Sequence, residues 1–222
     1  MDIQFSKELM EKFGETILKR KREWSFFESV WYAIDWRNKQ LRNLQSWYKA
    51  HLDLFKKEYS THSRIVSLLN SLNGLTNDEK AIACLRWVKN NMRYVRDIDS
   101  VWKVMEHWQT PKESFNLREG DCEDGSILLI ALLNLAGIPD YQYEVECGYV
   151  DGFGYKGGHA YVKYHSNTNG LTYVLDWCLG YDPRSINSRP LFNDSKVYKK
   201  TWFSFNEEHS WKRIKDPREK FK

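Results

Sequence analysis

The sequence predicts an α+β protein in which one apolar helix packs on an antiparallel sheet and an α-helical extension precedes this core. Three patterns favour this fold class. Residues 117–137 read LREGDCEDGSILLIALLNLAG, an apolar helix pattern that ends in glycine. Residues 141–177 contain short runs in which apolar and polar side chains alternate, as in half-buried strands. In residues 24–59, apolar side chains recur at steps of three, four or seven, the spacing of one face of a helix.

Composition indicates a globular protein that does not need covalent cross-links. Of its 222 residues, 41% are hydrophobic and 15% aromatic, enough to bury a sizeable core. The four cysteines are far apart and no two have CxxC spacing, which favours reduced thiols. The periodic patterns place Cys84 on the apolar face of a helix and Cys147 on that of a strand, so we expect both in the core.

Turn-forming residues divide the chain into three parts. The sequence SLNGLT places a boundary near Asn73, and Asn77 is the expected N-cap of the helix that follows. We therefore expect a helical extension over residues 1–72, formed by one long amphipathic helix or a helical hairpin. The core is expected over residues 73–195, and residues 196–222 form a basic, aromatic C-terminal segment.

The net charge of +4 is unevenly distributed. Residues 73–195 hold 12 basic and 17 acidic side chains, whereas both flanking parts are basic. Solvated helix faces produce such a pattern, and docking onto an acidic partner would fit it too, because exposed charge steers association. The polar residues Asn38 and Gln45 lie on or beside the apolar stripe of the extension, which leaves open whether it packs on the core or on another copy of the chain.

Membrane and nucleic-acid partners are not expected. The chain has no run of 18 apolar residues, and its first ten residues alternate charged and apolar side chains. We therefore expect a soluble cytoplasmic protein without a signal peptide. The basic residues are concentrated in expected surface helices and no nucleic-acid-binding motif occurs, so nucleic acid is disfavoured as a partner.

Three strands are expected in the second half of the core. They cover residues 141–150, 159–165 and 171–177, with a glycine-rich connection over residues 151–158 between the first two. Asn169–Gly170 is a turn signal, which predicts that the second and third strands form a hairpin.

The register of that hairpin brings two polar residues together. Residue numbers of paired positions have a constant sum in an antiparallel hairpin, so a turn centred between Asn167 and Thr168 places His159 opposite Asp176. Opposed side chains share one face with Cβ atoms roughly 4.5–5.5 Å apart, within reach of an imidazole–carboxylate hydrogen bond. A slip of two residues would keep both on one face, and a slip of one would separate them.

Cys122 follows Gly120 and Asp121 at the expected start of the apolar helix. Unpaired N–H groups and the helix dipole favour a thiolate there, so a depressed pKa is expected for this thiol. With His159 as base and Asp176 as the group that orients the imidazole, Cys122 would be the nucleophile of a thiol site. Each residue taken alone also fits ordinary packing, and the prediction depends on their combination.

Several short motifs surround these residues. GDCED (Gly120–Asp124) opens a helix, HA (His159–Ala160) begins a strand and VLD (Val174–Asp176) ends one. Upstream lie further motif residues, namely Tyr94, Asp97, Trp108, Thr110, Pro111 and Glu113. Together these motifs resemble the transglutaminase-like superfamily, especially its bacterial and phage-type cysteine peptidase branch. The resemblance covers about residues 73–177 and does not include the N-terminal helices.

The resemblance implies a papain-like α+β core with a Cys122–His159–Asp176 triad that acts on amide bonds through an acyl-thioester. Such chemistry also needs donors for the oxyanion. The backbone N–H of Cys122 is the first candidate, and the side chain of Gln109 or Trp108 is the second.

Two departures from the family pattern concern the packing around this triad. Gly125 and Ser126 stand where relatives often have an aromatic or small apolar residue and alanine, and Cys178 follows shortly after Asp176. Neither departure removes a member of the triad.

The expected function is a thiol hydrolase that cleaves a peptide, isopeptide or related amide bond in a protein or peptide substrate, without cofactor or metal. Acyl transfer to a lysine amine shares every step up to the thioester and stays open. A third possibility also stays open, namely a structural or assembly protein that keeps the fold without catalysis, for example in a phage virion. A zinc site from Cys122, Cys147, Cys178 and His159 has suitable ligands but lacks paired-ligand spacing.

Overall fold

The computed structural model describes residues 44–152, 154–180 and 182–212. The chain divides into two compact units, Met1–Gln40 and Leu41–Lys222, and every described element belongs to the second unit. The helical pattern predicted for residues 24–43 lies outside the described residues, as do residues 213–222.

Helices dominate the first half of the described chain and strands the second half. A helix over residues 44–59 is followed by α3 (Ser63–Ser71), α4 (Asn77–Asn91), α5 (Pro111–Leu117) and α6 (Cys122–Leu135). Short 3-10 helices are η1 (Asp97–Asp99), η2 (Asp140–Gln142) and η3 (Ile186–Ser188). The strands are β1 (Arg93–Tyr94), β2 (Glu119–Gly120), β3 (Tyr143–Gly152), β4 (Tyr155–His165), β5 (Thr172–Leu175), β6 (Tyr198–Phe205) and β7 (Ser210–Lys212).

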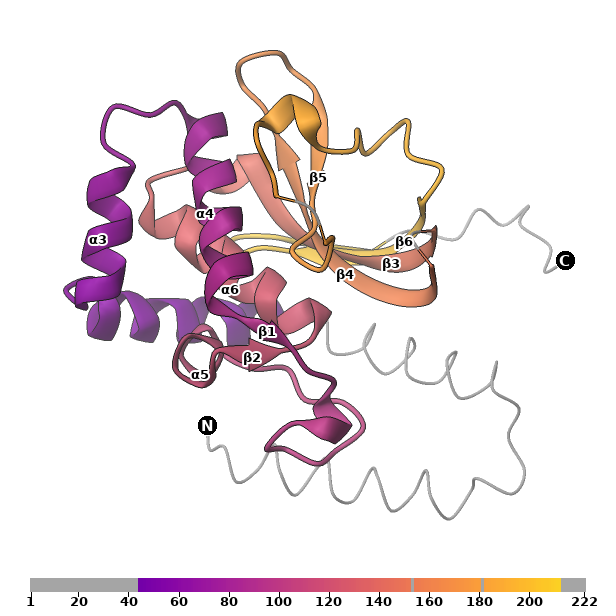
Figure 1. Ribbon diagram of the computed structural model, residues 1–222, viewed down its shortest axis with the longest axis horizontal. Coiled ribbons are helices and arrows are strands. Elements are labelled where there is room, and N and C mark those ends of the chain that lie inside the picture. The colour runs from indigo at the N-terminus through magenta and orange to yellow at the C-terminus, as the bar shows by residue number, and fades with distance from the viewer. Residues whose placement is uncertain (1–43, 153, 181, 213–222) are drawn as a thin grey trace, which may run out of the picture. The chain divides into compact units, whose positions relative to one another are not determined.

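Five strands form one antiparallel sheet in the order β5-β4-β3-β6-β7 (Figure 1). The β3–β4 hairpin is its centre and pairs from Tyr143–Tyr164 to Gly152–Tyr155. β1 and β2 form a separate parallel pair that joins the end of α4 to the start of α6. The predicted α+β class with an antiparallel sheet is confirmed.

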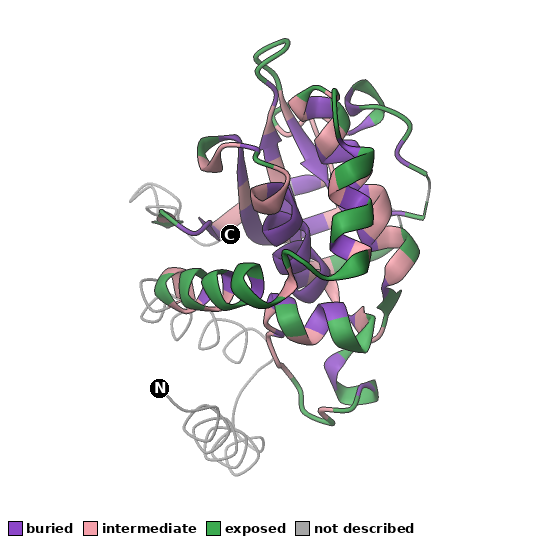
Figure 2. Ribbon diagram, turned by 90° about the vertical axis from the view of Figure 1, so that its left-hand side faces the viewer, coloured by how far each residue is buried: buried purple, intermediate pink, exposed green. Residues whose placement is uncertain are grey.

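Helix α6 forms the centre of the core. Its residues Ile127–Leu133 are fully buried on every side, as expected for a helix that is apolar all round. The sheet covers it through β3 and β4, and α4 and α5 cover it from the helical side. Figure 2 shows this central region in purple, whereas the outer helices expose one green face. No helix among the described residues is long and apolar enough to cross a membrane.

The helix over residues 44–59 contributes to the same core. Tyr48 and Phe55 are fully buried and Leu52 nearly so. The Tyr48 ring packs edge-on against Phe205 at 5.9 Å, and the Phe55 ring against Phe115 at 5.8 Å. In the described residues, the apolar stripe predicted from the sequence therefore faces the core. The division at residues 72 and 195 stays a prediction.

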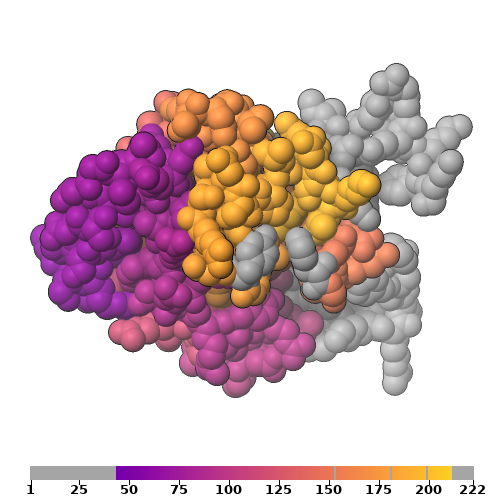
Figure 3. Space-filling model, turned by 45° about the horizontal axis from the view of Figure 1, so that its top comes forward, coloured from indigo at the N-terminus to yellow at the C-terminus, as the bar shows by residue number. Residues whose placement is uncertain are grey.

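Strand β6 brings part of the segment 196–222 into the sheet. It pairs with β3 from Val145–Phe205 to Val150–Tyr198, with two irregularities in register. Phe203 and Phe205 are fully buried. Figure 3 shows this yellow segment on the same face of the molecule as the orange region of β4 and β5.

Two local expectations were wrong. The N-cap of α4 is Thr76, whose Oγ1 accepts from the Glu79 amide while the Glu79 carboxylate accepts from the Thr76 amide, so Asn77 is the first helical residue. The glycine-rich segment 151–158 was predicted as a connection, but it extends both strands of the β3–β4 hairpin. Gly154, in the turn, has φ 78°, a conformation that favours glycine.

Candidate active site

Cys122 is the first residue of α6, and Asp121 is its N-cap. Asp124, the last residue of the motif and the third of the helix, reaches back so that its Oδ2 accepts from the Asp121 amide at 3.1 Å. Asp124 is fully buried, and its Oδ1 accepts from the backbone N–H of Gln109 at 2.8 Å. A Cβ at Gly120 would lie 2.5 Å from the Asp124 carboxylate. The GDCED motif therefore fixes where the helix begins and ties it to the preceding loop.

His159 and Asp176 are in direct contact across two strands. His159 lies on β4, Asp176 lies one residue beyond β5, and the distance between His159 Nε2 and Asp176 Oδ2 is 2.8 Å. The predicted register was wrong by two residues, because β4 and β5 pair Val162 with Leu175. A slip of two preserves the face of the sheet, which is why the contact survives the error.

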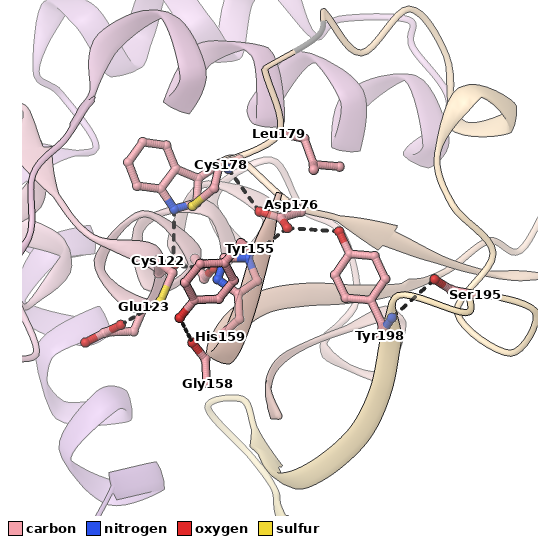
Figure 4. Close-up of polar contacts among 12 residues, drawn as sticks. Cys122, Glu123, Tyr155, Gly158, His159, Asp176, Cys178, Leu179, Ser195 and Tyr198 are labelled. Atoms are coloured by element: carbon pink, nitrogen blue, oxygen red, sulfur yellow. Dashed lines mark hydrogen bonds and ion pairs between the residues drawn. The ribbon is translucent and has the colours of Figure 1, made fainter. Parts of the chain in front are cut away.

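The Asp176 carboxylate is held by three donors. It is only 2% exposed. Besides His159 Nε2, its Oδ2 accepts from the Tyr198 hydroxyl at 2.9 Å, and its Oδ1 accepts from the Cys178 amide at 2.9 Å (Figure 4). Burial by itself raises the pKa of Asp176, but the hydrogen bonds from His159, Tyr198 and Cys178 outweigh burial and hold that pKa below its ordinary value.

The thiol of Cys122 does not have the depressed pKa that its position predicted. Burial raises the pKa of this thiol well above its ordinary value, and the negative charges of Glu123 and Asp121 raise it further. The Sγ donates to Glu123 Oε2 at 3.0 Å. The acidic neighbours and burial therefore outweigh the helix N-terminus, and Cys122 is a protonated thiol in this arrangement.

Figure 4 shows Cys122, His159, Asp176 and Cys178 in one cluster. The ligating atoms of His159, Asp176 and Cys178 lie within 4.8 Å of one another. Cys122 joins them through its electrostatic interaction with Cys178. Tyr155 covers part of this cluster: its ring centroid lies 5.9 Å from that of His159, and its hydroxyl donates to the Gly158 carbonyl at 2.6 Å.

The position of Trp177 explains why Gly125 departs from the family pattern. The Trp177 indole Nε1 donates to the Cys122 carbonyl at 3.1 Å, so the ring lies against the first turn of α6. A Cβ at Gly125 would lie 2.2 Å from the Trp177 ring. Ser126 Oγ donates to the same Cys122 carbonyl at 2.7 Å. Gly125 thus leaves room for the indole. Ser126 contributes a hydrogen bond to the start of the helix.

The two predicted oxyanion residues use their donors elsewhere. Gln109 is fully buried and its Nε2 donates to the Glu119 carbonyl at 3.1 Å. Trp108 Nε1 donates to Glu106 Oε1 at 2.9 Å, and its ring lies near Phe205. The role of Gln109 or Trp108 at an oxyanion stays a prediction.

One group of carboxylates beside the cysteine could hold a cation. The oxygens of Asp97, Asp121 and Asp124 lie within 4.8 Å of one another. Asp97 Oδ1, Asp121 Oδ1 and Gln109 Oε1 are buried acceptors that have no hydrogen-bond partner among the described residues. Burial raises the pKa of Asp97 to about 6 and that of Asp121 to about 7. Carboxylate and amide oxygens are the ligands that Ca²⁺ prefers.

The zinc site that the sequence left open is not assembled. Among the described residues, the groups that could hold a metal ion do not combine Cys122, Cys147, Cys178 and His159. Cys147 lies in the core on β3, as its strand pattern predicted.

A cavity of about 610 Å³ adjoins the site. Trp177 and Cys178 line it on one side and Tyr94 on another, and Arg86 and Lys89 of α4 add positive charge. Lys89 Nζ donates to the Trp177 carbonyl at 3.3 Å, and burial lowers the pKa of this ammonium group. The cavity shares Trp177 and Cys178 with the surroundings of Asp176.

Sequence reasoning missed Tyr198, Trp177 and Tyr155 as site residues. Trp177 directly follows the VLD motif and Tyr155 lies in the glycine-rich segment, so proximity along the chain was a usable signal for both. Tyr198 lies 22 residues beyond Asp176. Only the pairing of β6 with β3 reveals its place.

Comparisons with known proteins place the chain in a family. A family model described as a transglutaminase-like domain matches residues 63–201. Calcium-bound LapG of Legionella pneumophila has a similar fold, with TM-score 0.53 and 16% identity over 74% of this chain and 87% of that chain. EGTA-treated LapG of the same organism gives TM-score 0.52 and 17% identity over 75% and 86%. No curated protein matches the sequence. Because the family model spans more than half of its length, the chain belongs to the transglutaminase-like domain family.

Proposed function

We propose that this protein is a thiol hydrolase of peptide, isopeptide or related amide bonds, with Cys122 as nucleophile, His159 as base and Asp176 as orienting group. The observation that carries the proposal is the hydrogen bond between His159 Nε2 and Asp176 Oδ2, beside a cysteine at the N-terminus of the buried helix α6. Membership of the transglutaminase-like family supports the same assignment. A cysteine nucleophile that is activated by an oriented histidine suits acyl chemistry.

The proposed reaction begins with the protonated thiol. Because Nε2 of His159 contacts Asp176, Nδ1 is the ring nitrogen assigned to take the proton from Cys122 Sγ. The sulfur attacks the amide carbonyl carbon, and the imidazolium then gives the proton to the leaving amine. This leaves an acyl-thioester on Cys122. Water, deprotonated by the same imidazole, hydrolyses the thioester and restores the thiol.

A peptide library analysed by mass spectrometry tests this reaction without knowledge of the substrate. The purified chain should create new amine termini or free side-chain amines, and Cys122→Ala should create none. An added primary amine distinguishes hydrolysis from transfer, because transfer would incorporate that amine into the products. Turnover that persists in Cys122→Ala would contradict the proposal.

We also propose that Asp97, Asp121 and Asp124 bind a calcium ion, with the Gln109 amide oxygen as a further ligand. These oxygens fit the ion because three of them are buried acceptors that no donor of the described part of the chain reaches, and one solved structure of similar fold is calcium-bound. A bound cation would offset the carboxylate charges beside Cys122.

Thermal unfolding with and without calcium tests this site directly. Calcium at 100 times its Kd should stabilise the chain by about 2.7 kcal/mol, and Asp97→Asn should lose that response. Magnesium is the control, because its smaller, octahedral shell suits dedicated protein cages less well. A midpoint that calcium does not change would contradict the proposal.

A further inference from the structure

Tyr198 reaches the proposed site from a part of the chain that the motifs do not include. It is the first residue of β6, and its hydroxyl donates to Asp176 Oδ2 at 2.9 Å. The same oxygen contacts His159 Nε2 at 2.8 Å. Tyr198 and His159 therefore converge on one oxygen of a single carboxylate (Figure 4).

The position of the Tyr198 hydroxyl is fixed by packing. Tyr198 is only 6% exposed and belongs to a small apolar cluster with Val150, Tyr161 and Val174. Its ring packs edge-on against Tyr161 with centroids 4.6 Å apart. Its backbone position is paired with Val150 of β3. A buried ring held by strand pairing and by aromatic contact has little freedom to turn its hydroxyl away.

Asp176 needs such support because it lies just beyond the ladder. The last residue of β5 is Leu175, so backbone pairing does not hold Asp176 as it holds His159 on β4. Its carboxylate is oriented by its hydrogen bonds instead: Cys178 N–H on Oδ1, and Tyr198 and His159 on Oδ2. Residues that orient a reacting group are often supported by a further shell of hydrogen bonds.

We infer that Tyr198 is a positioning residue, whose hydroxyl holds the Asp176 carboxylate in the orientation that His159 requires. The inference rests on the proposed function, because His159 matters only if it serves Cys122. It makes strand β6 part of the proposed site through Tyr198.

Tyr198→Phe removes the hydroxyl and keeps the ring. The rate of Cys122 alkylation by iodoacetamide should fall about tenfold, the size expected for a lost hydrogen bond to a charged group. Tyr161→Phe is the matched control: it makes the same change in the same apolar cluster, and the hydrogen bonds of Asp176 do not involve Tyr161. It should alkylate at the wild-type rate.

A spectroscopic readout separates positioning from a general loss of structure. The ¹⁵N shifts of His159 report which ring nitrogen carries the proton, and in wild type they should show Nε2–H bonded to a carboxylate. Tyr198→Phe should shift these resonances, whereas Tyr161→Phe should leave them unchanged. If Tyr198→Phe does not fold, the chemical shift of Tyr198 Cζ is compared between wild type and Asp176→Ala instead. The two shifts should differ, because Asp176→Ala removes the acceptor of the Tyr198 hydroxyl.

The outcomes distinguish the inference from the function on which it rests. If wild-type Cys122 reacts, His159→Ala slows it and Tyr198→Phe changes neither rate nor resonances, the positioning role is overturned and the proposed function stands. If His159→Ala leaves the alkylation rate unchanged, the proposed function fails, and the His159 resonances still test the Tyr198–Asp176 contact.

Discussion

At the scale of single residues, the site depends on close contacts that leave no space for larger side chains. Trp177 lies against the first turn of α6 because Gly125 has no Cβ, and its indole holds the Cys122 carbonyl. The helix start that carries the cysteine is therefore held by two side chains: Asp124 accepts from the Asp121 amide, and Trp177 donates to the Cys122 carbonyl.

Gly125→Ala should destabilise the fold and displace Trp177. The added methyl would lie 2.2 Å from the ring, and overpacking of this kind costs about 1–3 kcal/mol of unfolding free energy. Denaturant unfolding measures the loss, and tryptophan fluorescence reports the movement of the ring. Gly180→Ala is the matched control, because a Cβ there meets no atom within 4 Å. Equal stability of Gly125→Ala and wild type would contradict this packing.

Glu146 makes stability depend on pH. It is 1% exposed on β3, and burial raises its pKa to about 7, although the Thr201 hydroxyl and Lys163 lower it. Because the folded pKa lies above the unfolded value, the contribution of Glu146 to stability is fully present below about pH 4.5 and is lost as the pH rises through about 7. At about 1.4 kcal/mol per pH unit, this loss is about 3 kcal/mol.

Glu146→Gln should remove this dependence. The neutral amide has no charge to bury, so the variant should be more stable than wild type above pH 7 and show a flatter profile between pH 4.5 and 7. Thermal midpoints measured across this range test it. Glu208→Gln, at an exposed position, should keep the wild-type profile. A profile of Glu146→Gln that parallels wild type would show that Glu146 does not titrate in this window.

The sequence predicted some residues of the site and could not predict others. The His159–Asp176 contact was predictable because a two-residue register error leaves both side chains on one face. The raised pKa of Cys122 was not predictable. The helix N-terminus can be read from the sequence, but the burial that raises this pKa cannot. Tyr198 was invisible, since its contact depends on strand pairing over a long separation.

At the scale of elements, capping fixes the segments that lead to the cysteine. Helix α5 begins with Thr110 as N-cap, whose Oγ1 accepts from the Glu113 amide, and Glu113 accepts from the Thr110 amide in return. Its position after Gln109 aligns the loop that contacts Asp124. The T-P-x-E spacing of this segment is that of a capping box with proline at the first helical position.

Thr110→Ala should lower stability by about 1 kcal/mol, because one amide of the first turn of α5 loses its acceptor. Thr110→Ser keeps the hydroxyl and should stay within a few tenths of a kcal/mol of wild type. Urea unfolding measures both. If the alanine and serine variants are equally stable, the hydroxyl does not cap the helix.

Strand and helix types were predictable where periodicity was clear, and connections were not. The apolar pattern that ends at Gly137 gave α6 nearly to the residue. The segment 151–158 reads as a loop because glycines usually interrupt strands, yet its residues complete the longest hairpin. Gly152 shows why a small residue is required there: a Cβ would lie 2.6 Å from the Val197 side chain.

At the scale of the whole molecule, the core is built from distant parts of the chain. Phe205 of β6 is fully buried against Tyr48 of the first described helix, and their rings are 5.9 Å apart. Neither segment belongs to the region that the motifs cover. The apolar stripe of the first segment left packing on the core open, and the place of Phe205 depends on strand pairing over a long sequence separation.

Phe205→Ala should destabilise the molecule by about 3–5 kcal/mol, because it opens a cavity where β6 meets the helix over residues 44–59. Trp211→Ala on β7 is the control, since Trp211 is 44% exposed and its removal should cost far less. Chemical denaturation of both variants provides the comparison. A Phe205→Ala loss below that of Trp211→Ala would place β6 outside the core.

The central claim is that Cys122, His159 and Asp176 act as one unit. Its most direct test is the rate at which iodoacetamide alkylates each of the four cysteines near neutral pH, resolved by peptide mass spectrometry. We predict that Cys122 reacts first and that both His159→Ala and Asp176→Ala slow it strongly, while the buried Cys84 and Cys147 stay unlabelled. Alkylation of Cys122 at the same rate in wild type and both variants would contradict the account.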